Sequence, residues 1–238
     1  MKPYTVKIMG DELSVFSKSE AAFDKEDCPD GSVLIEPSFE YDFFLNIYNE
    51  KYRKINAYSS AASAADFLLF RRGLPLDEIS FFVGGRTITV YNRKKGVLSV
   101  EVPKCKFKFT KLPDFMGAPI NLFYSDAAED VFFLEVKNTC DFDAALAPTI
   151  LLKELQRGGG ALIVFSRSDG ICYAKSFVSH LEYPPYQLDI AAYLAAYLMF
   201  RGVSLNRMIL NEFEVILERF DSMAILSFSA ETENPYHQ

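Results

Sequence analysis

Several residue types that carry common chemistry are scarce in this sequence. It contains no tryptophan, two histidines and four cysteines, and no two cysteines form a Cys-x-x-Cys pair. This pattern argues against a zinc site, so we expect neither a metal ion nor a cofactor. The cysteines are instead predicted to be small structural side chains in a reduced protein: Cys28, Cys105, Cys140 and Cys172.

Long runs of positive charge and long apolar runs are also missing. The formal net charge is −7, and the basic clusters at 71–72 and 93–95 are short. Binding to nucleic acid needs clustered positive charge, so no nucleic-acid partner is expected. The longest apolar run, at 190–200, is too short to cross a bilayer, and the first residues have no signal-peptide core. We therefore expect a cytoplasmic protein without a membrane partner.

The sequence does contain enough apolar material for a core. Of its 238 residues, 50% are hydrophobic and 15% are aromatic. These fractions are typical of a folded globular protein, and the length suits one large domain or two of ordinary size. A linker is predicted over 113–130 and a helix over 142–156. Runs of apolar, β-branched and aromatic residues between turn signals predict strands over 4–9, 13–17, 32–37, 41–49, 78–84, 86–92, 97–102, 106–112, 130–138, 161–167, 171–182, 207–221 and 224–231.

Two helix-like segments of the chain repeat each other. Residues 58–73 read YSSAASAADFLLFRRG and residues 187–202 read QLDIAAYLAAYLMFRG, with the same length and the same Arg-Gly ending. After one gap, the same alignment brings VLS at 97–99 onto ILS at 225–227. A helix that is apolar nearly all round must be buried, so each copy is expected at the centre of its own half of the chain.

The repeat predicts a duplicated architecture. We expect an α+β fold of two pseudo-symmetric domains, residues 1–115 and 116–238, each a curled antiparallel sheet or barrel around a central helix. The last strand of the chain can pack in the first half. Ser59 or Ser60 is predicted to cap the first helix and Asp189 the second, because short polar side chains accept hydrogen bonds from free helix N–H groups.

This plan resembles the diaminopimelate epimerase family over nearly the whole chain. The stretches that carry the resemblance are LNIYNEKYRKINAYSSAASAADFLLFRRGL, FFVGGRTITVYNRKKGVLSVEV and QLDIAAYLAAYLMFRGV. The resemblance implies two halves, each built around a helix, with a ligand held in the cleft between them. In the family each helix starts with Cys-Gly-Asn-Gly or Cys-Gly-Thr-Gly. The two cysteines act on opposite faces of an amino-acid α-carbon, and the helix N-termini bind the substrate carboxylate.

The residues at the two helix starts depart from that pattern. Aligned backward from the final glycines, the family cysteines fall on Tyr58 and Gln187. The residues that follow are Ser59-Ser60-Ala61 and Leu188-Asp189-Ile190 in place of the glycine-rich motifs. Tyrosine titrates near pH ~10 and glutamine does not titrate, so a two-base racemisation is excluded at these positions. Asp189 also brings a negative charge to a place where the family binds a carboxylate.

Two hypotheses about function follow. The first is a non-catalytic protein that binds a small molecule in the interdomain cleft or serves as a scaffold, with a homodimer as one arrangement. The second is a diverged isomerase that acts on an amino-acid-like substrate with acid–base groups other than cysteine. Tyr58 and Gln187 are expected to face each other across the cleft, and their burial would count against an enzyme. The candidate ligand-binding residues are Tyr58, Ser59, Ser60, His180, Glu182, Gln187 and Asp189.

Overall fold

A computed structural model describes most of the chain in two compact units. The first unit comprises Met1–Glu101, Tyr186–Asp189 and Arg219–Gln238, and the second comprises Val102–Pro185 and Ile190–Glu218. The predicted domain boundary after residue 115, the predicted helix at 142–156, and Cys140 all lie outside the described residues. Those described are 4–17, 28–29, 31–48, 56–94, 96–112, 120–125, 128–137, 161–177, 185–220 and 223–232.

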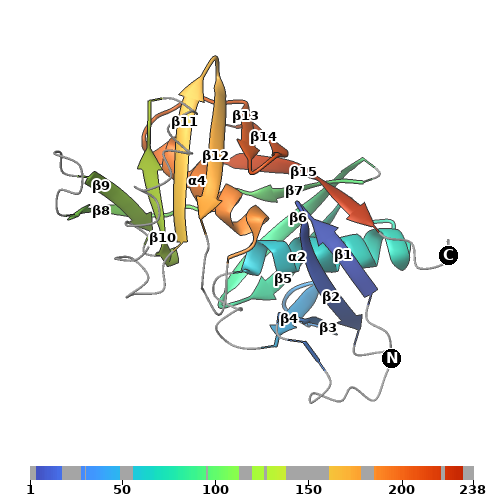
Figure 1. Cartoon of the computed structure of the whole chain (residues 1–238). Coiled ribbons are helices and arrows are strands. Elements are labelled where there is room, and N and C mark those ends of the chain that lie inside the picture. Colours follow the sequence, from blue (N-terminus) through green and yellow to red (C-terminus); the bar gives the residue numbers. More distant parts are fainter. Residues whose placement is uncertain are drawn as a thin grey trace. The chain divides into compact units, whose positions relative to one another are not determined.

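The strands of the first unit form a closed ring of backbone pairing (Figure 1). They pair in the order β1-β2-β3-β4-β5-β6-β7-β15, and β15 pairs again with β1. A closed ring leaves no unpaired strand edge among these strands. Their bounds are β1 (Tyr4–Ile8), β2 (Asp11–Ser17), β3 (Val33–Pro37), β4 (Phe43–Ile47), β5 (Glu78–Val83), β6 (Arg86–Lys94), β7 (Val97–Glu101) and β15 (Ala224–Thr232).

The helix α2 (Ala57–Asp66) contacts each of the strands β1 to β7, and all of its residues are buried. Its sequence, AYSSAASAAD, is made almost entirely of Ala and Ser, which let the strands approach the helix backbone closely. The predicted side-chain cap at Ser59 or Ser60 is wrong, because the N-cap residue is Asn56 and no side chain of the helix caps it. The Ser60 hydroxyl instead donates back to the Asn56 carbonyl oxygen at 2.7 Å.

A π-helical turn, Phe67–Arg71, continues α2. The Arg72 N–H donates to the Phe67 carbonyl at 3.0 Å, and the Leu74 N–H donates to the Leu68 carbonyl at 3.1 Å. Gly73 has φ +68° and ends the helix as the sequence predicts, since that conformation suits glycine. A π-helical turn holds one residue more than an α-helical turn, which changes how the two helices align at their starts.

The strands of the second unit pair in the order β14-β13-β12-β11-β10-β9-β8. The helix α4 (Gln187–Phe200) passes into this unit at Ile190. Its Tyr197 ring stacks on Phe133 with 5.2 Å between ring centroids, and the rings of Phe107 and Phe165 contact it edge-on. The strand bounds are β8 (Phe107–Leu112), β9 (Ile120–Ser125), β10 (Ala128–Glu135), β11 (Ala161–Ser168), β12 (Ile171–Phe177), β13 (Arg207–Leu210) and β14 (Phe213–Arg219).

The α+β class predicted from the sequence is confirmed as a mixed fold rich in strands, but purely antiparallel sheets are wrong. The pairs β2–β3, β4–β5, β10–β11 and β12–β13 are parallel. Parallel neighbours need long connections that carry the chain back to the same edge. The helices supply two of these connections, α2 between β4 and β5 and α4 between β12 and β13.

Two segments differ locally from their predictions. The predicted linker at 113–130 contains the strand β9 and the start of β10. The predicted single strand at 207–221 is a hairpin of β13 and β14, because Asn211 and Glu212 take positive φ angles and turn the chain. Most of the remaining described strands lie where the alternation of apolar residues predicts them. Of the described cysteines, Cys172 is buried as expected, whereas Cys28 and Cys105 are half-buried.

Candidate functional site at the starts of the two helices

The start of α2 is held by a carboxylate from the start of α4. Asp189 accepts hydrogen bonds from the backbone N–H groups of Tyr58 and Ser59, at 2.8 and 3.0 Å. The first N–H groups of a helix have no partner within the helix and carry partial positive charge, so a carboxylate is a favourable acceptor there. Asp189 is only 1% exposed, so these bonds are shielded from water. The prediction that Asp189 caps its own helix is therefore wrong, since its side chain caps the other one.

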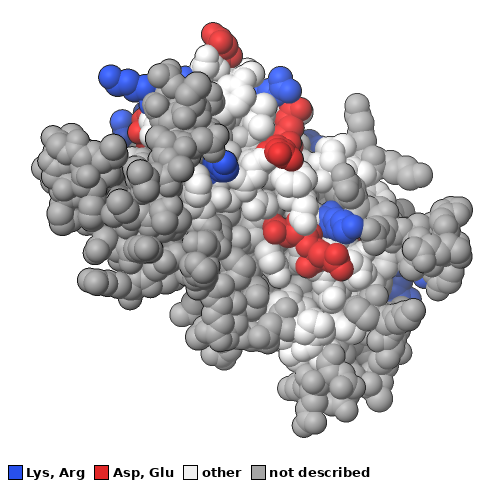
Figure 2. Space-filling model, viewed as in Figure 1, with Lys and Arg blue, Asp and Glu red and all other residues white. Residues whose placement is uncertain are grey.

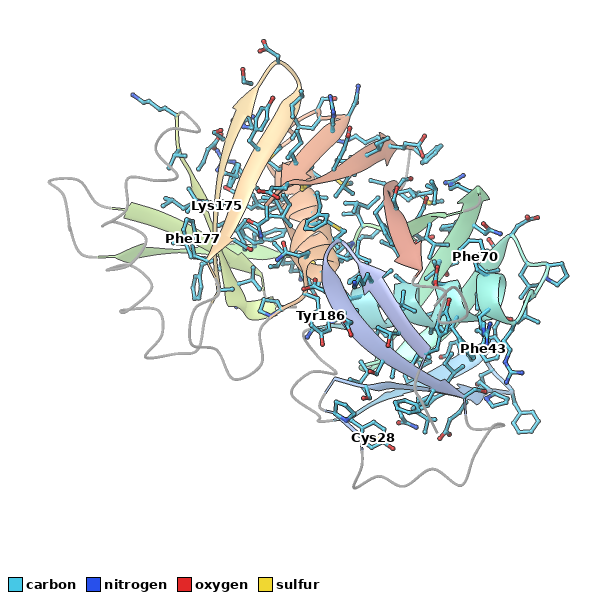
Figure 3. The ribbon with its side chains drawn as sticks, turned by 45° about the vertical axis from the view of Figure 1, so that its right-hand side comes forward. Cys28, Phe43, Phe70, Lys175, Phe177 and Tyr186 are labelled. Carbon is cyan, nitrogen blue, oxygen red and sulfur yellow. The ribbon has the colours of Figure 1, made fainter. Side chains whose placement is uncertain are left out.

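The start of α4 is held in a related way. The Gln187 N–H donates a hydrogen bond to the Asp11 carboxylate, and the Tyr186 N–H donates to the Asn56 side-chain oxygen at 2.7 Å. Figure 3 shows Tyr186 where the chain enters α4. Asp11 is the first residue of β2 and follows a tight turn in which Gly10 has φ +84°. All of these groups belong to the first unit, so both helix starts are satisfied within it by the chain's own side chains.

Burial raises the pKa values of the Asp11 and Asp189 carboxyl groups toward 7. Burial raises the pKa of Asp189 to about 6, against the lowering effect of the Ser59 hydroxyl, the Ser59 and Tyr58 amides and the Arg86 charge. Burial also raises the pKa of Asp11 to about 7, where the bond from Gln187 lowers it and the charge of Asp189 raises it further. Both carboxyl groups therefore titrate closer to neutral pH than an exposed aspartate does.

The predicted site residues differ in how far they are buried. Tyr58, Ser59 and Ser60 are buried, with Tyr58 only 5% exposed, whereas Gln187 is half-buried. The burial proposed as a sign against an enzyme therefore holds for Tyr58 and not for Gln187. His180 and Glu182 lie outside the described residues.

Sequence reasoning missed Asp11 and Asn56. Asp11 was visible only as part of a turn after Gly10. Asn56 immediately precedes the helix, where Asn is a preferred capping residue, but its side chain serves the other helix.

The two helix starts correspond with a shift of one residue. The alignment without gaps pairs Tyr58 with Gln187, but the first helical residues are Ala57 and Gln187. The π-helical turn adds one residue to the first helix, so an alignment fixed at the final glycines is displaced by one at the other end. Ser59 and Asp189 are then equivalent, each as the third helical residue. At this position α4 has a carboxylate side chain where α2 has a hydroxyl side chain.

Other kinds of site were sought in the described part of the chain. There, no group of three or more His, Cys, Asp or Glu side chains is placed to hold a metal ion. No helix among the described residues is long and apolar enough to span a membrane. On the face drawn in Figure 2, acidic and basic side chains are interspersed. The carboxylates at the helix starts remain the most distinctive polar arrangement.

Comparison with solved structures shows the fold. A PhzC/PhzF phenazine biosynthesis protein of Clostridium difficile is similar with a TM-score of 0.66 and 12% identity, over 97% of this chain and 96% of that one. A proline racemase of Agrobacterium radiobacter, solved with bound carbonate, is similar with a TM-score of 0.65 and 11% identity, over 99% of this chain and 94% of that one. A hydroxyproline epimerase of Agrobacterium vitis, solved with trans-4-hydroxy-L-proline, is similar with a TM-score of 0.62 and 10% identity, over 98% of this chain and 89% of that one.

These likenesses show that the chain shares its fold with a PhzC/PhzF protein, a proline racemase and a hydroxyproline epimerase. No family model matches the sequence, and no curated protein matches it. At such low identity the fold is shared while the chemistry has to be argued from this chain's own residues.

Proposed function

We propose that this protein is a non-catalytic member of the epimerase fold, with a small-molecule-binding or scaffold role and no cysteine-based racemase activity. The observation that carries the proposal is the bond pair from the Tyr58 and Ser59 amides to Asp189, at 2.8 and 3.0 Å. A helix start of this kind selects carboxylates, and the resembling family uses it for its substrate. In this chain the buried carboxylate of Asp189 already accepts the hydrogen bonds of the Tyr58 and Ser59 N–H groups.

The ligands of the structural neighbours fit this interpretation. Carbonate and trans-4-hydroxy-L-proline, named with two of the neighbours, both present anionic oxygens of the carboxylate type. In this chain the Asp189 side chain presents a carboxylate to the N–H groups at the start of α2. A free carboxylate would have to displace it from two charge-assisted hydrogen bonds, which are stronger than hydrogen bonds between neutral groups.

Duplication of the chain is part of the proposal. The helices α2 and α4 each connect two parallel strands, β4–β5 and β12–β13. Ser99 and Ser227, which end the matched VLS and ILS segments, lie directly opposite each other in the antiparallel pair β7–β15, with their hydroxyls 2.8 Å apart. Pairing of a segment with its own repeat copy is the arrangement that two related halves of one chain would produce.

Removal of the internal carboxylate tests the proposal. Asp189→Ala leaves the buried Tyr58 and Ser59 amides without an acceptor, which should destabilise the fold by about 2 kcal/mol or more. Sodium formate, compared with sodium chloride at equal ionic strength, should then raise the melting temperature of Asp189→Ala and leave that of the wild type unchanged. Saturating formate at 100 times its dissociation constant would restore about 2.7 kcal/mol.

Asp189→Asn is the matched control for that experiment. It keeps one acceptor oxygen at similar size, so it should lose less stability and respond less to formate. Equal responses to formate and chloride in Asp189→Ala would contradict a carboxylate-selective site. A strong formate response in the wild type would show that Asp189 does not fill it.

The raised pKa values of two buried carboxyl groups favour a second candidate, a diverged isomerase. Asp11 and Asp189, with pKa values raised to about 7 and about 6, could exchange protons near neutral pH. Incubation of the wild type with a panel of amino acids in D2O, followed by proton NMR, distinguishes the two functions. The non-catalytic proposal expects every α-proton signal to persist. Enzyme-dependent loss of one α-proton signal would establish the isomerase instead.

A further inference from the structure

Aromatic side chains gather on the outer face of β4 and β5 in the first unit. Phe44 and Phe82 are direct neighbours across these strands, with ring centroids 5.7 Å apart. Tyr41 stacks on Phe82 at 5.0 Å with 17° between the ring planes. Leu45 and Phe81, which alternate with them, are fully buried, so the stacked rings point away from the core. Phe43, which Figure 3 labels, is the neighbour of Phe44 in β4 and stacks on the buried Phe81.

Phe39 lies in the turn that leads into this surface. Its side chain is fully exposed, at 111% of the reference value, and it lies two residues before Tyr41. We call Phe39, Tyr41, Phe44 and Phe82 the aromatic platform. A fully exposed phenylalanine contributes nothing to the core, and its place in the turn before a group of half-exposed rings favours an interaction surface.

The turn that carries Phe39 is held rigidly. The Ser38 hydroxyl oxygen accepts hydrogen bonds from the Glu40 and Tyr41 N–H groups, both at 3.2 Å. The Asp42 carboxylate accepts a hydrogen bond from the Ser80 N–H at 2.8 Å, which ties the end of the turn to β5. A surface that is already ordered loses little conformational entropy on binding, so the platform is prepared for a partner.

Acidic residues surround the platform in sequence and in strand register. Glu36 lies directly opposite Phe44 in the pair β3–β4. Glu40 and Asp42 are exposed on the turn, and Glu78 is exposed at the start of β5. The two segments that build the surface, 36–44 and 77–82, contain no Lys or Arg. The chain as a whole carries a net charge of −7.

We propose that the aromatic platform docks an arginine-containing, basic peptide segment of a partner protein. The planar guanidinium group stacks on aromatic rings and forms paired hydrogen bonds to carboxylates, so it matches both parts of this surface. The acidic residues attract the segment and the rings discriminate arginine from lysine. This docking role goes beyond the proposed small-molecule or scaffold function and does not depend on the state of Asp189.

Fluorescence anisotropy with a labelled peptide of alternating Arg and Gly tests the docking surface. The wild type should bind it saturably, and Phe39→Ser, which keeps every charge, should weaken binding at least about tenfold. Phe200→Ser removes another exposed phenylalanine, 57% exposed on α4, and should leave binding unchanged. Equal binding by Phe39→Ser and the wild type, or no binding by the wild type, would overturn the proposal.

Two controls separate this surface from general charge attraction. Glu40→Gln should weaken binding, while Glu218→Gln, which removes an exposed carboxylate of β14, should not. A peptide with Lys in place of Arg should bind more weakly. Equal effects of both Glu variants, or equal binding of both peptides, would reduce the interaction to net charge and overturn the role of the rings. If the wild type does not bind the peptide but sediments as a dimer, and Phe39→Ser sediments as a monomer, the surface docks a second copy of the chain instead.

Discussion

The two buried helices fill their units in opposite ways. Between Ala57 and Asp66, α2 has mostly Ala and Ser side chains, and the surrounding strands supply large ones such as Phe81 and Leu45. In α4 the helix itself supplies the volume, and its Tyr197 ring stacks on Phe133. Packing in a protein interior is governed by total volume, so a slender helix in a closed ring and a bulky helix against a sheet can both reach native density.

The features that the helices share lie at their ends. Both end at a glycine with φ +68°, Gly73 and Gly202. Both begin with N–H groups that donate to a carboxylate, Asp189 for α2 and Asp11 for α4. The comparison teaches that two helices with similar ends and a similar place between parallel strands can carry very different side chains along their length.

The buried acids of the two helices differ most, because Asp189 in α4 has hydrogen-bond partners and Asp66 in α2 has none among the described residues. Asp66, the last residue of α2, is 0% exposed, and neither carboxylate oxygen has a hydrogen-bond partner among the described residues. Burial raises its pKa from 3.8 to about 7. Because this folded-state pKa lies above the unfolded one, ionisation opposes folding. The resulting penalty is absent at low pH, grows as pH rises from about 4 and is complete above about 7.

Asp66→Asn should therefore stabilise the protein at alkaline pH and change little near pH 4. At about pH 8 the gain approaches 4 kcal/mol as an upper value, since each pKa unit corresponds to about 1.4 kcal/mol. Urea unfolding at both pH values measures the difference. Asp42→Asn, an exposed acid on the surface, serves as the control and should show no comparable pH-dependent gain. An Asp66→Asn variant that is no more stable than the wild type at pH 8 would contradict an ionisable, unpartnered Asp66.

The sequence predicts those parts of the fold that local signals determine. Alternating apolar residues locate most strands, and Gly73 and Gly202 end the helices where expected. Hydrogen bonds between residues far apart in the sequence could not be predicted from it. The Tyr58–Asp189 bond joins residues 131 positions apart, and the Gln187–Asp11 bond joins residues 176 positions apart. No local pattern in a single sequence identifies such pairs.

The π-helical turn had no local signal either. FLLFR is compatible with a regular helix, and only the pairing of Arg72 with Phe67 reveals the extra residue.

A larger residue in each helix tests the contrast in packing. Ala62→Leu, at a 0% exposed position of α2, should destabilise the protein by about 1–3 kcal/mol, because the strands of a closed ring cannot separate easily. Ala196→Leu, at a position of α4 that is 5% exposed, should cost less. Chemical denaturation of both variants gives the comparison. An equal or larger cost for Ala196→Leu would remove the distinction between the two units.

The smallest expected effect tests what the helices share. Gly73→Ala and Gly202→Ala each place a methyl group where no heavy atom lies within 4 Å, so only the backbone conformation at φ +68° is disfavoured. Each substitution should cost about 1–2 kcal/mol, and the two costs should agree closely. Gly→Asn at the same positions should cost less, because asparagine tolerates this conformation. Unfolding midpoints in urea would detect the difference, and clearly unequal costs at the two positions would show that the helix ends differ, as the side chains along the helices do.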